Sequence, residues 1–249
     1  MSVNKNNYKS VWNLYSTIII SFIIFITFTL AQSIILFLIQ KTQSDYVVDL
    51  KSLAYNYLGV ISFFSSICGC ICVYFFIKIK NFEFKKYLNI NYPSLKISIR
   101  FLSYTIALIF IMELISKSFP HLFDTDFVKD SYTNSNNLIF FYLGVVLFGP
   151  LFEELLFRGF LFKGIEKSFI GGPGAVLISS FIFSIIHVQY GFYIIVFLLF
   201  PMSLLLGYAR LKSGSILLPI FLHSFNNFVT SIITHLEVYQ NLNLGTCQI

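Results

Sequence analysis

An apolar run from Leu138 to Phe162 contains three formal charges, and this combination limits the possible folds of the chain more than any other feature. A run of that length crosses a hydrocarbon core about 30 Å thick when it is helical. The charges are Glu153, Glu154 and Arg158. Moving a charged side chain to the bilayer centre costs about 2.5–3.5 kcal/mol even on mild scales. Two adjacent carboxylates therefore require a partner, a water-filled cavity or a function.

Helical geometry supplies a partner for one of the two glutamates. At about 100° per residue, Arg158 lies on the same helix face as Glu154, whereas Glu153 points elsewhere. We therefore expect Glu154 and Arg158 to pair and Glu153 to remain the free carboxylate. Pro150, one turn earlier, lacks a backbone N–H, so we expect a kink that opens room for water.

The composition places the whole chain in a membrane. Of its 249 residues, 57% are hydrophobic and 11% are charged, which is too apolar for a soluble domain. The net charge of +6 would suit nucleic acid, but the basic residues cluster in short loops between apolar runs. Because that pattern is the orientation signal of membrane proteins, we exclude nucleic-acid binding. The cysteines lack C-x-x-C spacing, and we interpret them as packing residues.

The apolar runs predict an all-α fold, a polytopic transmembrane helical bundle of about seven to eight spans. An eighth, partly buried segment would lie between Lys80 and Pro93. We expect residues 1–249 to form a single integral membrane domain, with the amino terminus inside and the carboxyl terminus outside. The seven runs cover residues 12–39, 53–77, 97–118 and 138–162, a fifth run ending near 188, a sixth ending at 210, and 213–235.

The basic residues predict the orientation of these spans. Alternating the spans brings four basic segments to one side, which are Lys5 with Lys9, the 78–100 loop, Lys163 with Lys167, and Arg210 with Lys212. Positively charged loops mark the cytoplasmic side, so the loop 119–137 is expected outside. We expect a multi-pass integral membrane protein of a bacterial cell membrane.

Further polar residues interrupt the fifth and seventh apolar runs. They are His187, and His223 followed by Asn226 and Asn227. Counted from the cytoplasmic ends at about 1.5 Å per residue, Glu153, His187 and Asn227 lie about 18–20 Å deep. His223 lies about 14 Å deep on the same count. Each residue alone is often an interhelical hydrogen-bonding group, but together they suit hydrolysis, or proton or cation binding in a transporter.

Three motifs in the second half of the chain resemble those of one family. They are E-E-x-x-x-R from Glu153 to Arg158, F-x-x-x-H from Phe183 to His187, and H-x-x-x-N from His223 to Asn227. This set resembles the CPBP intramembrane proteases, also called the CAAX-protease and bacteriocin-processing, or Abi, family. The resemblance covers residues 138–235, which we take as the catalytic core. It implies an integral membrane endopeptidase whose partners are the lipid bilayer and a membrane-associated peptide or protein substrate.

The resemblance and the chemistry of the residues together suggest a mechanism. Glu153 with His187 would take a proton from water, and the hydroxide would attack the scissile carbonyl. His223 and Asn227 would stabilise the oxyanion that forms. The site would then work without a metal.

A metal-dependent alternative stays open from the sequence. His187, His223 and Glu154 could hold zinc with an activated water, while Glu153 remained the base. In the metal-free scheme Glu154 and Arg158 would instead orient the helix. No H-E-x-x-H motif occurs, so the sequence does not identify a cofactor.

Two other functions compete with proteolysis. A bacteriocin-immunity or membrane scaffold protein could use the same cavity without catalysis, but it would have no need to keep charge in the membrane. A transporter is disfavoured because the short chain lacks paired halves with two similar polar breaks.

Overall fold

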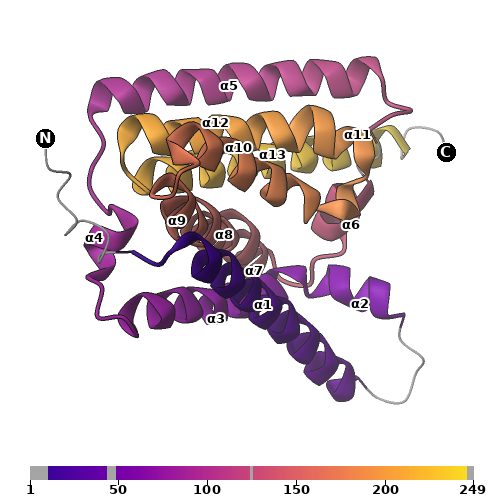
Figure 1. Ribbon diagram of the computed structural model, residues 1–249. Helices are drawn as coiled ribbons and strands as arrows, with labels where there is room; N and C mark the ends of the chain where they lie inside the picture. Colours follow the sequence, from indigo (N-terminus) through magenta and orange to yellow (C-terminus); the bar gives the residue numbers. More distant parts are fainter. Residues whose placement is uncertain (1–10, 44–48, 124–125, 246–249) are drawn as a thin grey trace, which may run out of the picture.

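The computed structural model describes residues 11–43, 49–123 and 126–245. Every regular element within these residues is helical (Figure 1), which confirms the predicted all-α class. Six of the helices are long and apolar enough to cross a membrane. A shorter apolar helix, α10 (Gly171–Ile185), has 15 residues and corresponds to the fifth predicted run. The chain is therefore a polytopic integral membrane protein.

The remaining helices follow the order of the apolar runs, with η marking π- or 3₁₀-helical turns. The long spans are α1 (Leu14–Thr42), α3 (Leu58–Lys78), α5 (Leu95–Ser118), Leu138–Glu166, Phe192–Ser213 and α13 (Leu217–Gly245). The fourth of these consists of α7 (Leu138–Phe141), η2 (Tyr142–Phe148), α8 (Gly149–Glu154), η3 (Leu155–Leu161) and α9 (Phe162–Glu166). The fifth consists of α11 (Phe192–Ile194), η5 (Ile195–Leu199) and α12 (Phe200–Ser213). The short elements are α2 (Leu50–Asn56), α4 (Phe84–Leu88), α6 (Asp126–Thr133) and η4 (Val188–Tyr190).

Polar caps set several helix boundaries close to the ends of the apolar runs. The side chain of Asn13 accepts a hydrogen bond from the Ser16 amide at the start of α1. Asn137 caps α7 by accepting from the amides of the second and third helical residues. α12 ends at Gly214, whose φ of 65° lies in the left-handed region that favours glycine. Short polar residues and glycine thus explain where these spans begin and end.

The fourth span is the central helix of the bundle. Its residues 154–165 are all buried. Helices α1, α3, α4, α10 and α13 pack against parts of it, as Figure 1 shows. A helix that is covered all round has apolar residues all round, which accounts for the lack of a polar face in this run. Charges in its buried half therefore meet protein instead of lipid.

Small residues allow α3 to approach the central helix closely. A Cβ atom placed on Gly144 would lie 2.3 Å from the Gly59 carbonyl oxygen, and one on Gly59 would lie 2.4 Å from the Phe141 nitrogen. Real Cβ contacts are not that short, so both positions require glycine. Close backbone approach through small residues is usual where membrane helices associate.

The segment between Lys80 and Pro93, proposed above as an eighth span, forms only the five-residue helix α4. Tyr87 and Leu88 in this helix are buried in the core, and the Tyr87 ring stacks on Phe160 of the central helix. The segment packs against the bundle, because its apolar side chains contact the central helix. It is too short to cross a bilayer.

Candidate active site

The predicted pair between Glu154 and Arg158 forms in fully buried surroundings. Arg158 Nη1 donates to Glu154 Oε1 at 3.0 Å, and both side chains are 0% exposed. Arg158 Nη2 donates to the Ser203 carbonyl oxygen at 3.0 Å and to Ser203 Oγ at 2.5 Å. The guanidinium also lies 4.5 Å from the centre of the Phe183 ring. These contacts replace part of the hydration that the buried charges lose, whereas Glu154 Oε2 and Arg158 Nε have no hydrogen-bond partner among the described residues.

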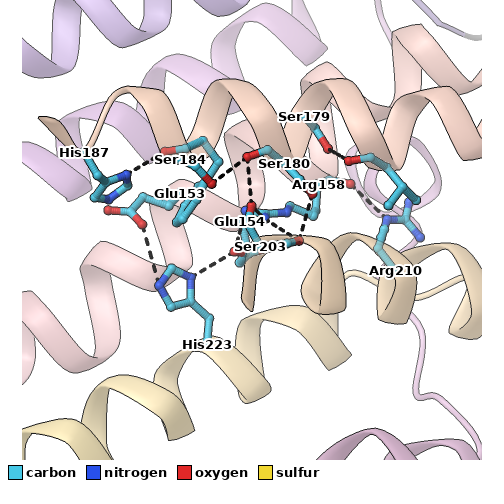
Figure 2. A network of polar contacts seen from close by, with 12 residues as sticks. Glu153, Glu154, Arg158, Ser179, Ser180, Ser184, His187, Ser203, Arg210 and His223 are labelled. Atoms are coloured by element: carbon cyan, nitrogen blue, oxygen red, sulfur yellow. Dashed lines mark hydrogen bonds and ion pairs between the residues drawn. The ribbon is translucent and has the colours of Figure 1, made fainter. Parts of the chain in front are cut away.

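Serines of α10 and α12 form hydrogen bonds around Ser203, the residue that binds Arg158. Ser180 Oγ donates to the Ser203 carbonyl at 2.9 Å, and Ser203 Oγ donates to the Ser180 carbonyl at 3.2 Å. Ser184 Oγ donates to the same Ser180 carbonyl at 2.9 Å (Figure 2). The sequence analysis passed over these serines, because a hydroxyl in a membrane helix commonly bonds its own backbone. The sequence does contain a signal for this serine cluster, because the four-residue spacing of Ser180 and Ser184 places both on one helix face.

Glu154 also fixes the ring of His223. Nδ1 of His223 lies 2.9 Å from Glu154 Oε1, and a carboxylate only accepts, so Nδ1 is the donor. Nε2 of the same ring lies 3.7 Å from Glu153 Oε2. The role predicted for Glu154 was to orient the central helix with Arg158. The geometry adds a second role, because the carboxylate sets the orientation and tautomer of an imidazole.

Glu153 is the carboxylate that the buried pair leaves free. Its side chain is 23% exposed, and in Figure 2 its carboxylate points toward the space between His187 and His223. The structure thus brings together Glu153, His187 and His223, three of the four groups that the predicted mechanism uses. The imidazole nitrogen 3.7 Å from Glu153 Oε2 belongs to His223, whereas the sequence predicted His187 as the partner of Glu153.

The end of α10 fixes the orientation of the His187 ring. The amide of His187 donates to the Ser184 carbonyl, which leaves the Phe183 carbonyl without the amide donor that a continuing α-helix would supply. Nδ1 of His187 lies 2.6 Å from that Phe183 oxygen. A carbonyl oxygen only accepts, so Nδ1 carries the proton and Nε2 is the acceptor of the neutral ring.

Asn227 donates a hydrogen bond to the Val145 carbonyl, which Pro150 leaves without a helical donor. The Gly149 amide donates to the Gly144 carbonyl in a π turn, and residue 150 is a proline without an N–H. The Val145 carbonyl is therefore left without a helical donor. Asn227 Nδ2 donates to it at 3.0 Å. Asn227 thus attaches α13 to the central helix at a carbonyl within η2 that Pro150 leaves without a helical donor.

Arg210 satisfies a carbonyl in the second π turn in the same way. The Phe162 amide donates to Phe157 and Gly159 and leaves the Arg158 carbonyl to another donor. Arg210 Nε donates to that Arg158 oxygen at 2.9 Å, and Nη2 donates to the Leu88 carbonyl at 3.3 Å. The sequence analysis assigned Arg210 to a basic inner loop, but its side chain is buried. It is a positioning residue that links α4, α12 and the helix segment carrying Arg158.

The explanation for Asn227 leads to a double-mutant prediction. Asn227→Ala should destabilise the protein by about 0.6 kcal/mol, the average for interhelical hydrogen bonds in a membrane protein. In a Pro150→Ala background residue 150 gains an N–H for the Val145 carbonyl, so the same change should cost less than half as much. Unfolding in mixed detergent micelles measures both costs.

Asn226→Ala is the matched control for this cycle. Asn226 Nδ2 donates to Asn227 Oδ1 and makes no bond to Val145. Its replacement should cost the same in both backgrounds. An equal cost of Asn227→Ala with and without Pro150 would contradict the assignment of the Val145 bond to the proline.

Tyr190 is a neighbour of the site that the sequence analysis missed. Its ring lies 6.0 Å from the His187 ring, centre to centre, in the η4 turn between α10 and α11. Its phenol can both donate and accept a hydrogen bond.

The three residues named as possible zinc ligands, His187, His223 and Glu154, already take part in hydrogen bonds. Within residues 11–43, 49–123 and 126–245, no three His, Cys, Asp or Glu side chains come together as a potential metal site. Glu154 Oε1 already accepts from Arg158 and His223. Nδ1 of each histidine donates to Glu154 or to a carbonyl, which leaves Nε2 of both rings open, as in histidines that bind a metal through Nε2. The Nε2 atoms of both rings are therefore available to a substrate, a water molecule or a metal ion.

A cavity of about 450 Å³ lies beside this cluster. Tyr190 and Asn227, the neighbours of His187 and His223, line it. Its other walls come from α3, the central helix, α5, α6, the fifth span and α13. Glu153, His187 and His223 are not among the lining residues, so the cavity meets the cluster through Tyr190 and Asn227.

Comparison with known proteins agrees with the motifs. Residues 135–229 match the family model described as type II CAAX prenyl endopeptidase Rce1-like. This stretch contains all three motifs, and the resemblance to CPBP intramembrane proteases is confirmed. A curated Escherichia coli protein, named "Uncharacterized 24.3 kDa protein", is 34% identical over 82 residues, which cover 32% of this chain and 38% of that protein. The match thus spans less than half of that relative. No solved structure matches the chain.

Proposed function

We propose, from the Rce1-like match over residues 135–229, that this membrane protein is an intramembrane endopeptidase acting on a membrane-associated protein or peptide. The family is one of CAAX-type intramembrane proteases, which supports peptide hydrolysis as the reaction class. The observation that carries the proposal is the free carboxylate of Glu153 beside two imidazoles, next to a cavity. We propose a single domain over residues 1–249, with the catalytic core at 138–235, in a bacterial cell membrane.

Glu153 is the general base in the proposed mechanism. It takes a proton from a water molecule, which His187 Nε2 orients by accepting the other hydrogen. The hydroxide adds to the scissile carbonyl carbon and forms a tetrahedral intermediate. Glu153 then returns the proton to the leaving amine as the C–N bond breaks, so the carboxylate is regenerated.

His223 and Asn227 stabilise the negative oxygen of that intermediate. His223 is held by Glu154 through Nδ1 and presents Nε2 to the space beside Glu153. When protonated there, Nε2 donates to the oxyanion. Asn227 uses one amide hydrogen on the Val145 carbonyl and has a second one to donate. Burial of these donors strengthens their effect because little water screens them.

Glu154, Arg158, Ser203 and Arg210 act as positioning residues. They touch neither substrate nor water in this scheme. Arg158 links Glu154 to the serine cluster, and Glu154 links Arg158 to His223. Preorganised dipoles need not reorient during the reaction. These residues therefore lower the activation barrier by holding His223 in its catalytic orientation.

The test of the function is a search for cleavage products. The wild-type chain and Glu153→Ala are each co-expressed with candidate membrane-tethered peptides, and the products are identified by mass spectrometry. We expect a defined cleavage that only the wild-type chain produces. A protein that binds such peptides without cleaving any of them would instead fit the immunity or scaffold function.

A further prediction concerns metal. Active, detergent-purified protein is expected to keep its turnover in the presence of a strong zinc chelator. His223→Ala should lower turnover by about a hundred- to a thousandfold, as for the loss of one oxyanion donor. Elemental analysis before and after chelation, with turnover assays on both samples, measures this. One tightly held zinc per chain that disappears in His223→Ala would contradict the metal-free mechanism.

A further inference from the structure

We infer that the catalytic cluster is reached through the 450 Å³ cavity from the membrane face opposite the basic loops, and that the cavity receives an extended apolar stretch of the peptide substrate. The nature of the occupant rests on the proposed endopeptidase function. The direction of access rests instead on the arrangement of the helices, the charges at the two ends of the bundle and the lining of the cavity.

The two ends of the bundle differ in charge. At one end α3, α9 and α12 finish and α5, α10 and α13 begin, while the other end carries α2, α6 and the last turns of α5 and α13 (Figure 1). The first end holds Lys78, Lys80, Lys85, Lys86, Lys96, Arg100, Lys163, Lys167, Arg210 and Lys212. The second holds Lys41, Lys51, Lys117 and Lys129. By the positive-inside rule, the first end is cytoplasmic and the second faces outward.

The cavity extends toward the outward end. At that end Lys117 pairs with Glu113 at 2.7 Å on α5, and Lys129 of α6 pairs with Glu237 of α13 at 3.5 Å. All four of these side chains line the cavity. At the other limit the lining includes Met202 and Asn227, which lie farther from the outward ends of their helices. The cavity therefore leads from a charged rim to the neighbourhood of the cluster.

The short helix α10 explains why space remains on this side. Its 15 residues rise about 22 Å, so a helix starting at the cytoplasmic end stops before the far side of a core about 30 Å thick. His187 follows directly at its end, and the chain turns back through η4 into α11. The cavity lies on the side toward which α10 ends, and its lining reaches the cluster at Tyr190, three residues after His187.

The lining favours a peptide over a hydrocarbon chain. Apolar walls come from Ile109, Met112, Ile194, Leu198 and Met202. The end near the cluster adds Asn226, Asn227 and the Tyr190 phenol, which can hydrogen-bond to peptide groups. A hydrocarbon tail makes no use of such groups. A membrane helix about 10 Å wide and about 30 Å long does not fit into this volume, whereas a few extended residues do.

Cysteine labelling tests the direction of access. Ile109 lines the cavity about 12 Å farther into the membrane than Lys117, and Phe110 beside it is 64% exposed on the outer face of α5. Ile109→Cys and the control Phe110→Cys are made in a Glu153→Gln chain whose four native cysteines, Cys68, Cys70, Cys72 and Cys247, are replaced by alanine. A membrane-impermeant maleimide is added to intact cells or to inverted vesicles. We expect Ile109→Cys to react in intact cells and the lipid-facing Phe110→Cys to react in neither preparation.

A second measurement tests the occupant. A capped tetraleucine peptide at ten times its Kd should slow labelling of Ile109→Cys about tenfold. Hexadecanol should not slow it. Labelling of Ile109→Cys only in inverted vesicles, or in neither preparation, would overturn the direction of access. Protection by hexadecanol equal to that by the peptide would overturn the occupant. Because labelling needs no turnover, a failure to find any cleavage would count against the proposed function and not against this route.

Discussion

Glu153→Gln is expected to abolish cleavage while the protein stays folded. Glutamine keeps the size of the side chain but cannot take a proton from water. The loss should reach at least about a hundredfold, within the range usual for general-base catalysis. Stability should change little, because the Glu153 side chain is 23% exposed and its recorded contact is the 3.7 Å approach to His223. Turnover of a verified substrate and thermal unfolding in detergent measure the two effects.

Glu154→Gln is the matched control, since it makes the same chemical change one residue later. Glu154 is 0% exposed and bonded to Arg158 and His223, so this variant should lose stability as well as activity. The two adjacent glutamates should therefore differ in unfolding temperature. Near-normal turnover of Glu153→Gln would show that another group is the base.

Arg158→Ala should cost about 3–5 kcal/mol of stability, because it leaves the Glu154 carboxylate buried and unpaired. The arginine also binds both the carbonyl and the hydroxyl of Ser203, so its loss frees further buried polar atoms. Lower accumulation in the membrane and a lower unfolding temperature are the expected results. Both can be measured by quantitative blotting and by unfolding in detergent.

Two further variants separate stability from catalysis. Lys117→Ala breaks the exposed pair with Glu113, which has the same four-residue spacing, and should cost less than about 1 kcal/mol. Glu154→Leu combined with Arg158→Met replaces the buried pair by apolar side chains and should recover much of the stability. It should not recover turnover, because His223 has lost the carboxylate that orients it. Wild-type stability of Arg158→Ala alone would contradict the role given to the pair.

The sequence predicted the parts of this protein that depend on near neighbours in the chain. Long apolar runs predicted the spans, because a helix in lipid satisfies its own backbone. The four-residue spacing predicted the bond between Glu154 and Arg158, because helix geometry alone brings these side chains together. Motif spacing also selected Glu153, His187 and His223. Each of these inferences uses a helix period or a composition that can be read within one segment.

The tertiary structure decided which distant groups meet those residues. Ser203 binds Arg158, Arg210 binds the Arg158 carbonyl, and Asn227 binds the Val145 carbonyl. These contacts depend on how neighbouring helices rotate and on which carbonyls the π turns leave open. The cavity likewise is lined by residues from helices far apart in the chain, among them α5, α6 and α13. The sequence by itself thus determined which helices are long and apolar enough to cross the membrane. The packing of separate helices decided the partners of their polar side chains, because the rotation and depth of each helix are set by contacts between segments far apart in the chain.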